Sequence, residues 1–174
     1  VVLYAPTWRD VEDACLFAWN YEKILDVLSS KFGGDFIMLL RLHPNIAKDS
    51  GELCSSNRII NASHHPDMQE LLAISDVLIS DYSSCFFEFS ITYKPVFLYG
   101  PDVAEYQKER GLLFDLTDLP FEMTTSLSEL EMSIRHFDDI AYRMRIDQFC
   151  ERIGLQETGH GAEHVSRILL QHLS

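Results

Sequence analysis

Short apolar runs alternate along the chain with stretches in which apolar residues recur every three or four positions. Runs that are apolar without strict polar alternation are typical of strands covered on both faces. Between the runs, the longer period predicts helices, and strands that alternate with helices indicate βαβ units and a parallel sheet. The predicted strands are Val1–Ala5, Asp35–Leu42, Arg58–Asn61, Asp76–Ser80 and Pro95–Tyr99.

Capping residues mark several of the predicted helices. Asn20 precedes an apolar stripe that ends at Gly33-Gly34, and Ser126-Leu127-Ser128-Glu129 resembles a capping box. From Ser126 onward the pattern is helical only, and no linker or repeat interrupts the chain. We therefore expect a single α/β domain over residues 1–174, with a Rossmann-like parallel sheet and helices on both faces. The predicted helices are Asn20–Phe32, Asp67–Ser75, Ser84–Tyr93, Val103–Arg110, Ser126–Phe137, Asp139–Ile153 and Gly161–Leu173.

Composition narrows the class of ligand. The 174 residues are 47% hydrophobic and 24% charged, which is ordinary for a globular domain and excludes a disordered chain. The net charge of −13 argues against a nucleic-acid partner, because binding to phosphate backbones needs a basic face. Four scattered cysteines show no metal-ligand spacing and favour a reducing, cytoplasmic setting without a metal. The apolar runs are too short to span a membrane, so no transmembrane segment is predicted. Since Val1 already opens a strand, we expect residues to be missing before it.

The segment after the fourth predicted strand is the most informative for chemistry. Asp81, Ser83 and Ser84 lie where a buried strand ends and a helix begins. In a parallel sheet this end faces the ligand, and two hydroxyls beside a helix start suit phosphate oxygens. Capping of the helix by Ser83 or Ser84 is an equally good interpretation, and one geometry can serve both purposes.

Other candidate ligands follow neighbouring strands. Thr7 and Arg9 come after the first strand, and His43, extended by Pro44, comes after the second. Arg110 and Gly111 end the helix after the fifth strand. Each has a structural alternative: a His that bonds loop carbonyls, or an arginine in a surface ion pair. His160 and His164 lack the order and third ligand of a zinc site.

These segments together resemble one family. Leu3-Tyr4-Ala5-Pro6-Thr7-Trp8-Arg9-Asp10, Arg41-Leu42-His43-Pro44, Ile74–Ser84 and Arg110-Gly111 are similar to the CDP-glycerol glycerophosphotransferases, which include the teichoic-acid polymerases. The resemblance implies the C-terminal, donor-binding half of a GT-B architecture. It implies transfer of glycerol phosphate, or a related polyol phosphate, from a CDP-activated donor to a cell-surface polymer or its lipid-linked primer.

The resemblance also implies roles for matching positions. It assigns His43 and Arg9 to the catalytic centre against the donor phosphates, with Ser83 and Ser84 holding the diphosphate. Asp81 would orient that loop or meet the ligand, and Glu88 is an acidic neighbour one turn on. The remaining donor-phosphate candidates are Thr7, Arg110, Gly111 and His160, of which His160 stands where the family often carries Lys.

The same resemblance implies no cofactor and no metal. The catalytic base and the acceptor contacts would come from an N-terminal domain that precedes this sequence, at the cytoplasmic face of the membrane. Two alternatives stay open from the residues. One is a GT-B donor domain for another nucleotide-sugar in capsule or polysaccharide synthesis, and the other is a binding module without catalysis.

Overall fold

The computed structural model describes residues 1–7, 19–42, 56–112, 114–155 and 157–173. Within them, one sheet of six parallel strands has the order β3-β2-β1-β4-β5-β6, so the predicted α/β class with a parallel sheet is confirmed. The sixth strand was not predicted, because two residues are too few to show a period. The strands are β1 Val2–Ala5, β2 Met38–Leu40, β3 Ile59–Asn61, β4 Val77–Ser80, β5 Val96–Tyr99 and β6 Met123–Thr124.

The helices follow the predicted spans closely, with caps that hold their first turns. Asn20 Oδ1 accepts from the Lys23 backbone N–H at 3.0 Å, and Asp67 Oδ1 accepts from that of Gln69 at 2.7 Å. One helix, α4, stops at Ser90 rather than Tyr93, because the chain turns there and Tyr93 takes a φ of 57°. The helices are α1 Tyr21–Phe32, α3 Met68–Ile74, α4 Cys85–Ser90, α5 Val103–Arg110, α6 Leu127–Arg135, α7 Asp139–Ile153 and α8 Gly161–Leu173.

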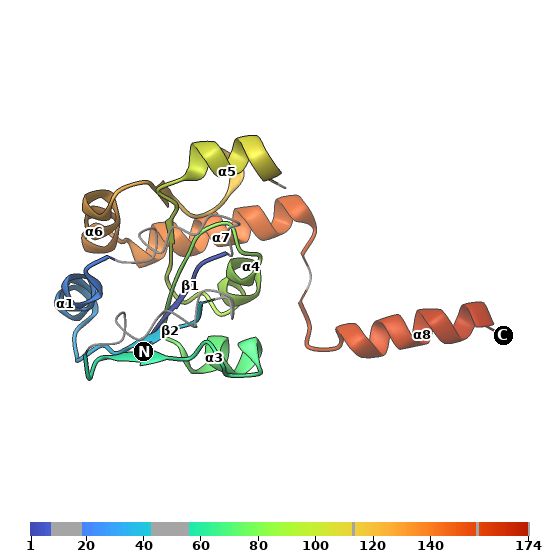
Figure 1. The fold of residues 1–174 in the computed structure, drawn as a ribbon. Coiled ribbons are helices and arrows are strands. Elements are labelled where there is room, and N and C mark those ends of the chain that lie inside the picture. Colours follow the sequence, from blue (N-terminus) through green and yellow to red (C-terminus); the bar gives the residue numbers. More distant parts are fainter. Residues whose placement is uncertain (8–18, 43–55, 113, 156, 174) are drawn as a thin grey trace.

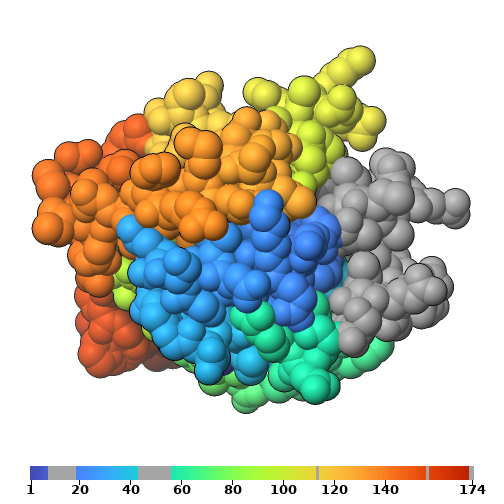
Figure 2. Space-filling model, turned by 90° about the vertical axis from the view of Figure 1, so that its left-hand side faces the viewer, coloured from blue at the N-terminus to red at the C-terminus, as the bar shows by residue number. Residues whose placement is uncertain are grey.

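Helices cover both faces of the sheet (Figure 1). Alternate residues of β1 point to opposite faces, so Val2 and Tyr4 enter one core while Leu3 and Ala5 enter the other. The first core contains buried residues of α1 and α6, which Figure 2 shows side by side on one side of the molecule. The second core contains residues of α3, α4 and α7. The sheet is therefore a rigid platform whose strand ends can present a ligand site.

The last helix has a different environment. Figure 1 shows α8 standing away from the sheet, beyond the end of α7. All of its residues from Gly161 to His172 are exposed, including Val165 at 55% and Leu169 at 56%. The sheet and its helices consequently form the folded body without α8.

Candidate functional site

A polar pocket of about 410 Å³ opens where the strand order reverses. The chain runs outward from β1 through β2 to β3 and then returns to place β4 beside β1. Ligands of doubly wound sheets bind beyond the carboxyl ends of strands at such a reversal. The pocket is lined by the last residue of β1, by residues that follow β1, β2, β3 and β4, and by residues of α3 and α4. They are Ala5, Pro6, Arg41, Leu42, Ser63, Met68, Gln69, Ser83, Ser84, Cys85 and Glu88.

Asp81, which follows β4, is hydrogen-bonded to Thr7, which follows β1. Its side chain is 1% exposed, and its carboxylate accepts from the Thr7 backbone N–H at 2.8 and 3.0 Å and from the Thr7 hydroxyl at 2.7 Å. The Tyr82 backbone N–H also donates to Oδ1, at 2.6 Å. A buried carboxylate needs such donors, because an unpaired charge there would be costly. Thr7, predicted to meet donor phosphate, and Asp81, predicted to orient this segment or meet the ligand, thus bind each other and fix the backbone directly after β1 at Thr7.

The two serines of this segment both line the pocket. Ser84 is the N-cap residue of α4, but its backbone is helical and its side chain makes no capping hydrogen bond to the described first turn. Ser83 Oγ accepts from the Cys85 backbone N–H at 3.5 Å, which is at the limit for a hydrogen bond. Capping therefore makes little use of these hydroxyls, and they remain available to a bound molecule.

Arg41 supplies the positive charge of the pocket, and the sequence analysis did not single it out as a ligand. Its Nη1 donates to the backbone carbonyls of His65 at 2.5 Å and Ala62 at 3.4 Å. Those two carbonyls hold the guanidinium in place without neutralising it, and no described carboxylate pairs with it. Among the described residues that line the pocket, Arg41 is the one cation. The only signal in the sequence was its position at the end of an apolar strand.

Glu88 is the one anion that the described part of the chain contributes to the lining. Its Oε2 accepts from Gln69 Nε2 at 2.5 Å, which ties α4 to α3 at the rim. The neighbouring Cys85 is a buried thiol whose pKa is raised by desolvation, so it stays protonated at neutral pH. It is therefore not an activated nucleophile.

Tyr82 holds the far side of the same segment. Its hydroxyl donates to Asp102 Oδ1 at 3.1 Å, and its ring stacks on Tyr106 at a centroid distance of 4.0 Å. Gly100 makes this possible, because a Cβ there would lie 2.3 Å from the Tyr82 hydroxyl oxygen. The segment that carries Asp81, Ser83 and Ser84 is thus fixed by contacts on both of its sides.

Several predicted site residues are not gathered here. Arg9 and His43 lie outside the described residues. Arg110 and Gly111 end α5, where both are exposed, and neither lines the pocket. His160 directly precedes α8, the helix that Figure 1 shows standing away from the sheet.

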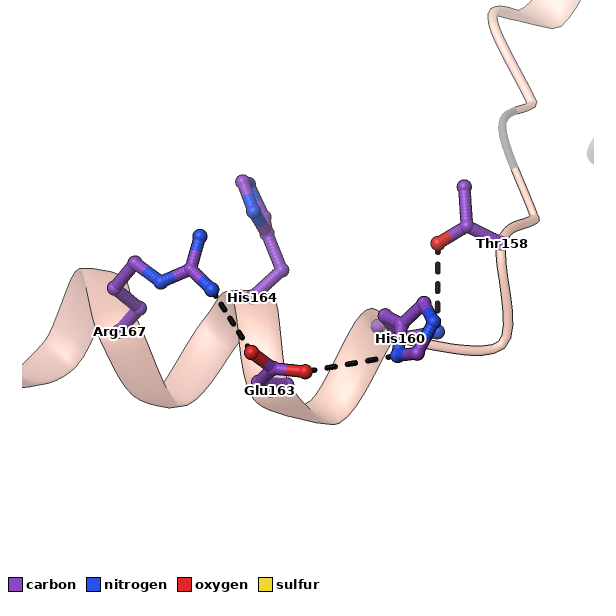
Figure 3. A pocket seen from close by; sticks show the side chains of 6 residues that line it. Thr158, His160, Glu163, His164 and Arg167 are labelled. Atoms are coloured by element: carbon purple, nitrogen blue, oxygen red, sulfur yellow. Dashed lines mark hydrogen bonds and ion pairs between the residues drawn. The ribbon is translucent and has the colours of Figure 1, made fainter.

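His160 takes part in a separate cluster on α8 (Figure 3). Its Nδ1 lies 3.6 Å from Glu163 Oε2, and Arg167 Nη2 donates to Glu163 Oε1 at 2.9 Å. The hollow along these side chains is formed by a single helix and the loop before it. We therefore read the cluster as exposed surface pairing, which contributes little energy.

The described part of the chain contains no group of three His, Cys, Asp or Glu side chains suited to a metal ion. None of its helices is both long and apolar enough to cross a bilayer.

Comparisons with known proteins add an independent observation. Residues 1–171 match the family described as CDP-Glycerol:Poly(glycerophosphate) glycerophosphotransferase. A teichoic acid poly(glycerol phosphate) polymerase of Staphylococcus epidermidis is 33% identical over 97% of this chain and 24% of its own length. A teichoic acid ribitol-phosphate primase of Bacillus spizizenii is 28% identical over 99% of this chain and 44% of its own.

Solved structures agree with the sequences. The wall teichoic acid polymerase TagF matches with a TM-score of 0.75 and 31% identity, over 98% of this chain and 42% of that one. A TagF variant soaked with CDPG matches with a TM-score of 0.75 and 29% identity. This likeness confirms the expected Rossmann-like half of a GT-B architecture. The chain spans less than half the length of these relatives.

Proposed function

Since the chain belongs to the CDP-glycerol:poly(glycerophosphate) glycerophosphotransferase family, we propose that its polar pocket binds the diphosphate of a CDP-activated polyol. The protein then transfers glycerol phosphate, or a related polyol phosphate, from CDP-glycerol to a teichoic-acid-like polymer or its primer. A CDPG-soaked structure among the relatives supports this donor.

The observation that carries the proposal is the meeting of Arg41, Ser83 and Ser84 in one pocket. Arginine suits phosphate oxygens because its planar, charged group can donate two hydrogen bonds to them, and serine hydroxyls can donate further hydrogen bonds. Arg41 follows β2 and the two serines follow β4, and these two strands lie on either side of β1 in the sheet. Arg41 and the serines therefore approach the pocket from opposite sides. A diphosphate between them would receive a charge from one side and hydroxyl donors from the other.

The reaction needs little more from this part of the protein. A hydroxyl of the acceptor attacks the phosphorus that bears the polyol, and the bond from that phosphorus to the oxygen of the departing CMP breaks. Negative charge grows on that oxygen, and a fixed cation lowers the barrier by stabilising it. We assign this role to Arg41, with Arg9 and His43 proposed beside the same phosphates. The base that takes the acceptor proton is proposed to come from outside residues 1–174.

The alternatives from the sequence have less support. A UDP- or CMP-sugar donor would occupy the same polar pocket, but the named relatives are glycerol-phosphate and ribitol-phosphate enzymes. A binding module without catalysis would use the same pocket, but the named relatives are a polymerase and a primase. We also propose a place at the cytoplasmic face of the membrane, where a CDP-activated donor and a lipid-linked primer meet.

Calorimetric titration tests the proposal. The protein should bind CDP-glycerol, and the double variant Ser83→Ala, Ser84→Ala should bind it roughly tenfold more weakly, because two hydrogen bonds to charged oxygens are lost. Ser166→Ala on α8 is the matched control and should bind like the wild type. If the protein bound a UDP-sugar and did not bind CDP-glycerol, the nucleotide-sugar alternative would replace our proposal.

A further inference from the structure

Arg41 carries the positive charge that the described residues bring to the polar pocket. An arginine side chain has many rotamers, so its charge serves a bound phosphate best when other groups hold it in one direction. The two carbonyls that accept from its guanidinium, those of Ala62 and His65, both belong to the loop that follows β3. The direction of the charge therefore depends on where this loop lies relative to the backbone of Arg41.

Ser63 joins this loop to the backbone on either side of Arg41. Its hydroxyl accepts from the Leu42 backbone N–H at 3.0 Å and donates to the Leu40 carbonyl at 3.4 Å. Strands β2 and β3 pair as far as Leu40, so the Ser63 side chain continues their connection past the end of the paired residues. One hydroxyl thus binds the two residues that flank Arg41.

The surroundings of Ser63 make this connection important. Ser63 is 5% exposed and Leu42 is 2% exposed, so the N–H group that the hydroxyl accepts from is shielded from water and is costly to leave unpaired. The backbone N–H of Ser63 donates to Asn61 Oδ1 at 2.9 Å. Further along the loop, His65 Nε2 lies 2.8 Å from Glu70 Oε2, but this pair is exposed and contributes little. Ser63 is therefore the buried anchor of the loop.

We propose that Ser63 is a positioning residue for the transfer reaction, because it holds the loop that directs the Arg41 guanidinium toward the donor diphosphate. This inference rests on the proposed function. Ser63 also lines the pocket, so a direct contact with the donor is the competing interpretation. The two interpretations differ in one respect. A residue that acts through Arg41 loses its effect when the guanidinium is removed, whereas a direct ligand keeps its effect.

A double-mutant cycle between Ser63 and Arg41 distinguishes the two interpretations, with the affinity for CDP-glycerol measured by calorimetry on the intact protein. Ser63→Ala should weaken binding about fivefold or more, which is within the range of couplings found in one hydrogen-bond network. In the Arg41→Gln background, the same change should alter the affinity by less than about twofold.

Ser75→Ala is the matched control for the loss of a buried hydroxyl. Ser75 is 0% exposed, and its hydroxyl donates to the Leu71 carbonyl at 2.6 Å, but it does not line the pocket. This variant should bind CDP-glycerol like the wild type. Urea unfolding of the Ser63 and Ser75 variants establishes that each is folded under the conditions of the titration.

Ser63→Cys provides the same test if Ser63→Ala does not fold. The thiol occupies a similar space but is a weak hydrogen-bonding group, so it should weaken CDP-glycerol in the wild-type background and not in the Arg41→Gln background. An equal loss in both backgrounds, or a wild-type affinity in the Ser63 variants, would overturn the positioning role alone. Failure of the wild type to bind CDP-glycerol would overturn the proposed function as well.

Discussion

At the residue scale, the chemistry of the pocket depends on side chains whose partners come from distant parts of the chain. Asp81 lies close in sequence to Ser83 and Ser84, but its carboxylate accepts hydrogen bonds from Thr7, which is 74 residues away. Arg41 is fixed by carbonyls at positions 62 and 65. The sequence showed a carboxylate, hydroxyls and cations near strand ends. It could not show which of them bind one another and which face a ligand, because those choices are made by packing.

Asp81→Asn tests whether this carboxylate holds the loop. The amide retains the size of the side chain but offers an N–H₂ group where Thr7 or Tyr82 also donates, so one buried donor loses its acceptor. We expect a destabilisation of about 1–3 kcal/mol in urea unfolding, together with weaker binding of CDP-glycerol. Asp35→Asn, at an exposed position, is the control and should leave both quantities unchanged. Equal stability of the two variants would show that the Asp81 contacts do not organise the loop.

At the element scale, the sequence predicted most of the fold. Local signals sufficed for α1, α6 and α7, since their caps and apolar periods lie within one stretch of chain. Strand β6 was not predicted, because it has only two residues and is defined by its pairing with β5, which is distant in sequence. The short α4 was overestimated, because the turn at Tyr93 depends on tertiary contacts that include its hydroxyl bond to Asp147 at 2.5 Å.

The capping box of α6 gives a prediction for pH. Glu129 Oε2 accepts from Thr125 N–H at 2.7 Å and from the Thr125 hydroxyl at 3.0 Å, and these bonds lower the pKa of Glu129 below its ordinary value of 4.5. A carboxyl whose pKa falls on folding stabilises the fold above its unfolded pKa. That stabilisation is lost as pH falls through the folded pKa.

Glu129→Gln should therefore be less stable than the wild type at pH 7, and the difference should shrink below about pH 4. Urea unfolding of both proteins across this range measures it. Glu105→Gln on α5 is the control. A difference that stays constant with pH would mean that the ionised carboxylate contributes nothing to this helix start.

At the scale of the whole molecule, the charge distribution sharpens the functional argument. The chain carries a net charge of −13, so its overall field repels an anionic donor. Binding must then come from a few local groups, and Arg41 is the one cation that lines the pocket within the described residues.

The most direct test of this account is the affinity of Arg41→Gln for CDP-glycerol, measured by calorimetry. Glutamine keeps an amide that can donate to the loop carbonyls but removes the charge, so the fold should persist. We predict that the affinity falls by about 10–100-fold, as expected for the loss of a charged hydrogen-bond donor, while binding of uncharged cytidine is unchanged. Arg167→Gln on α8 should match the wild type. An affinity of Arg41→Gln for CDP-glycerol within about twofold of the wild type would contradict the assignment of the pocket to the donor phosphates.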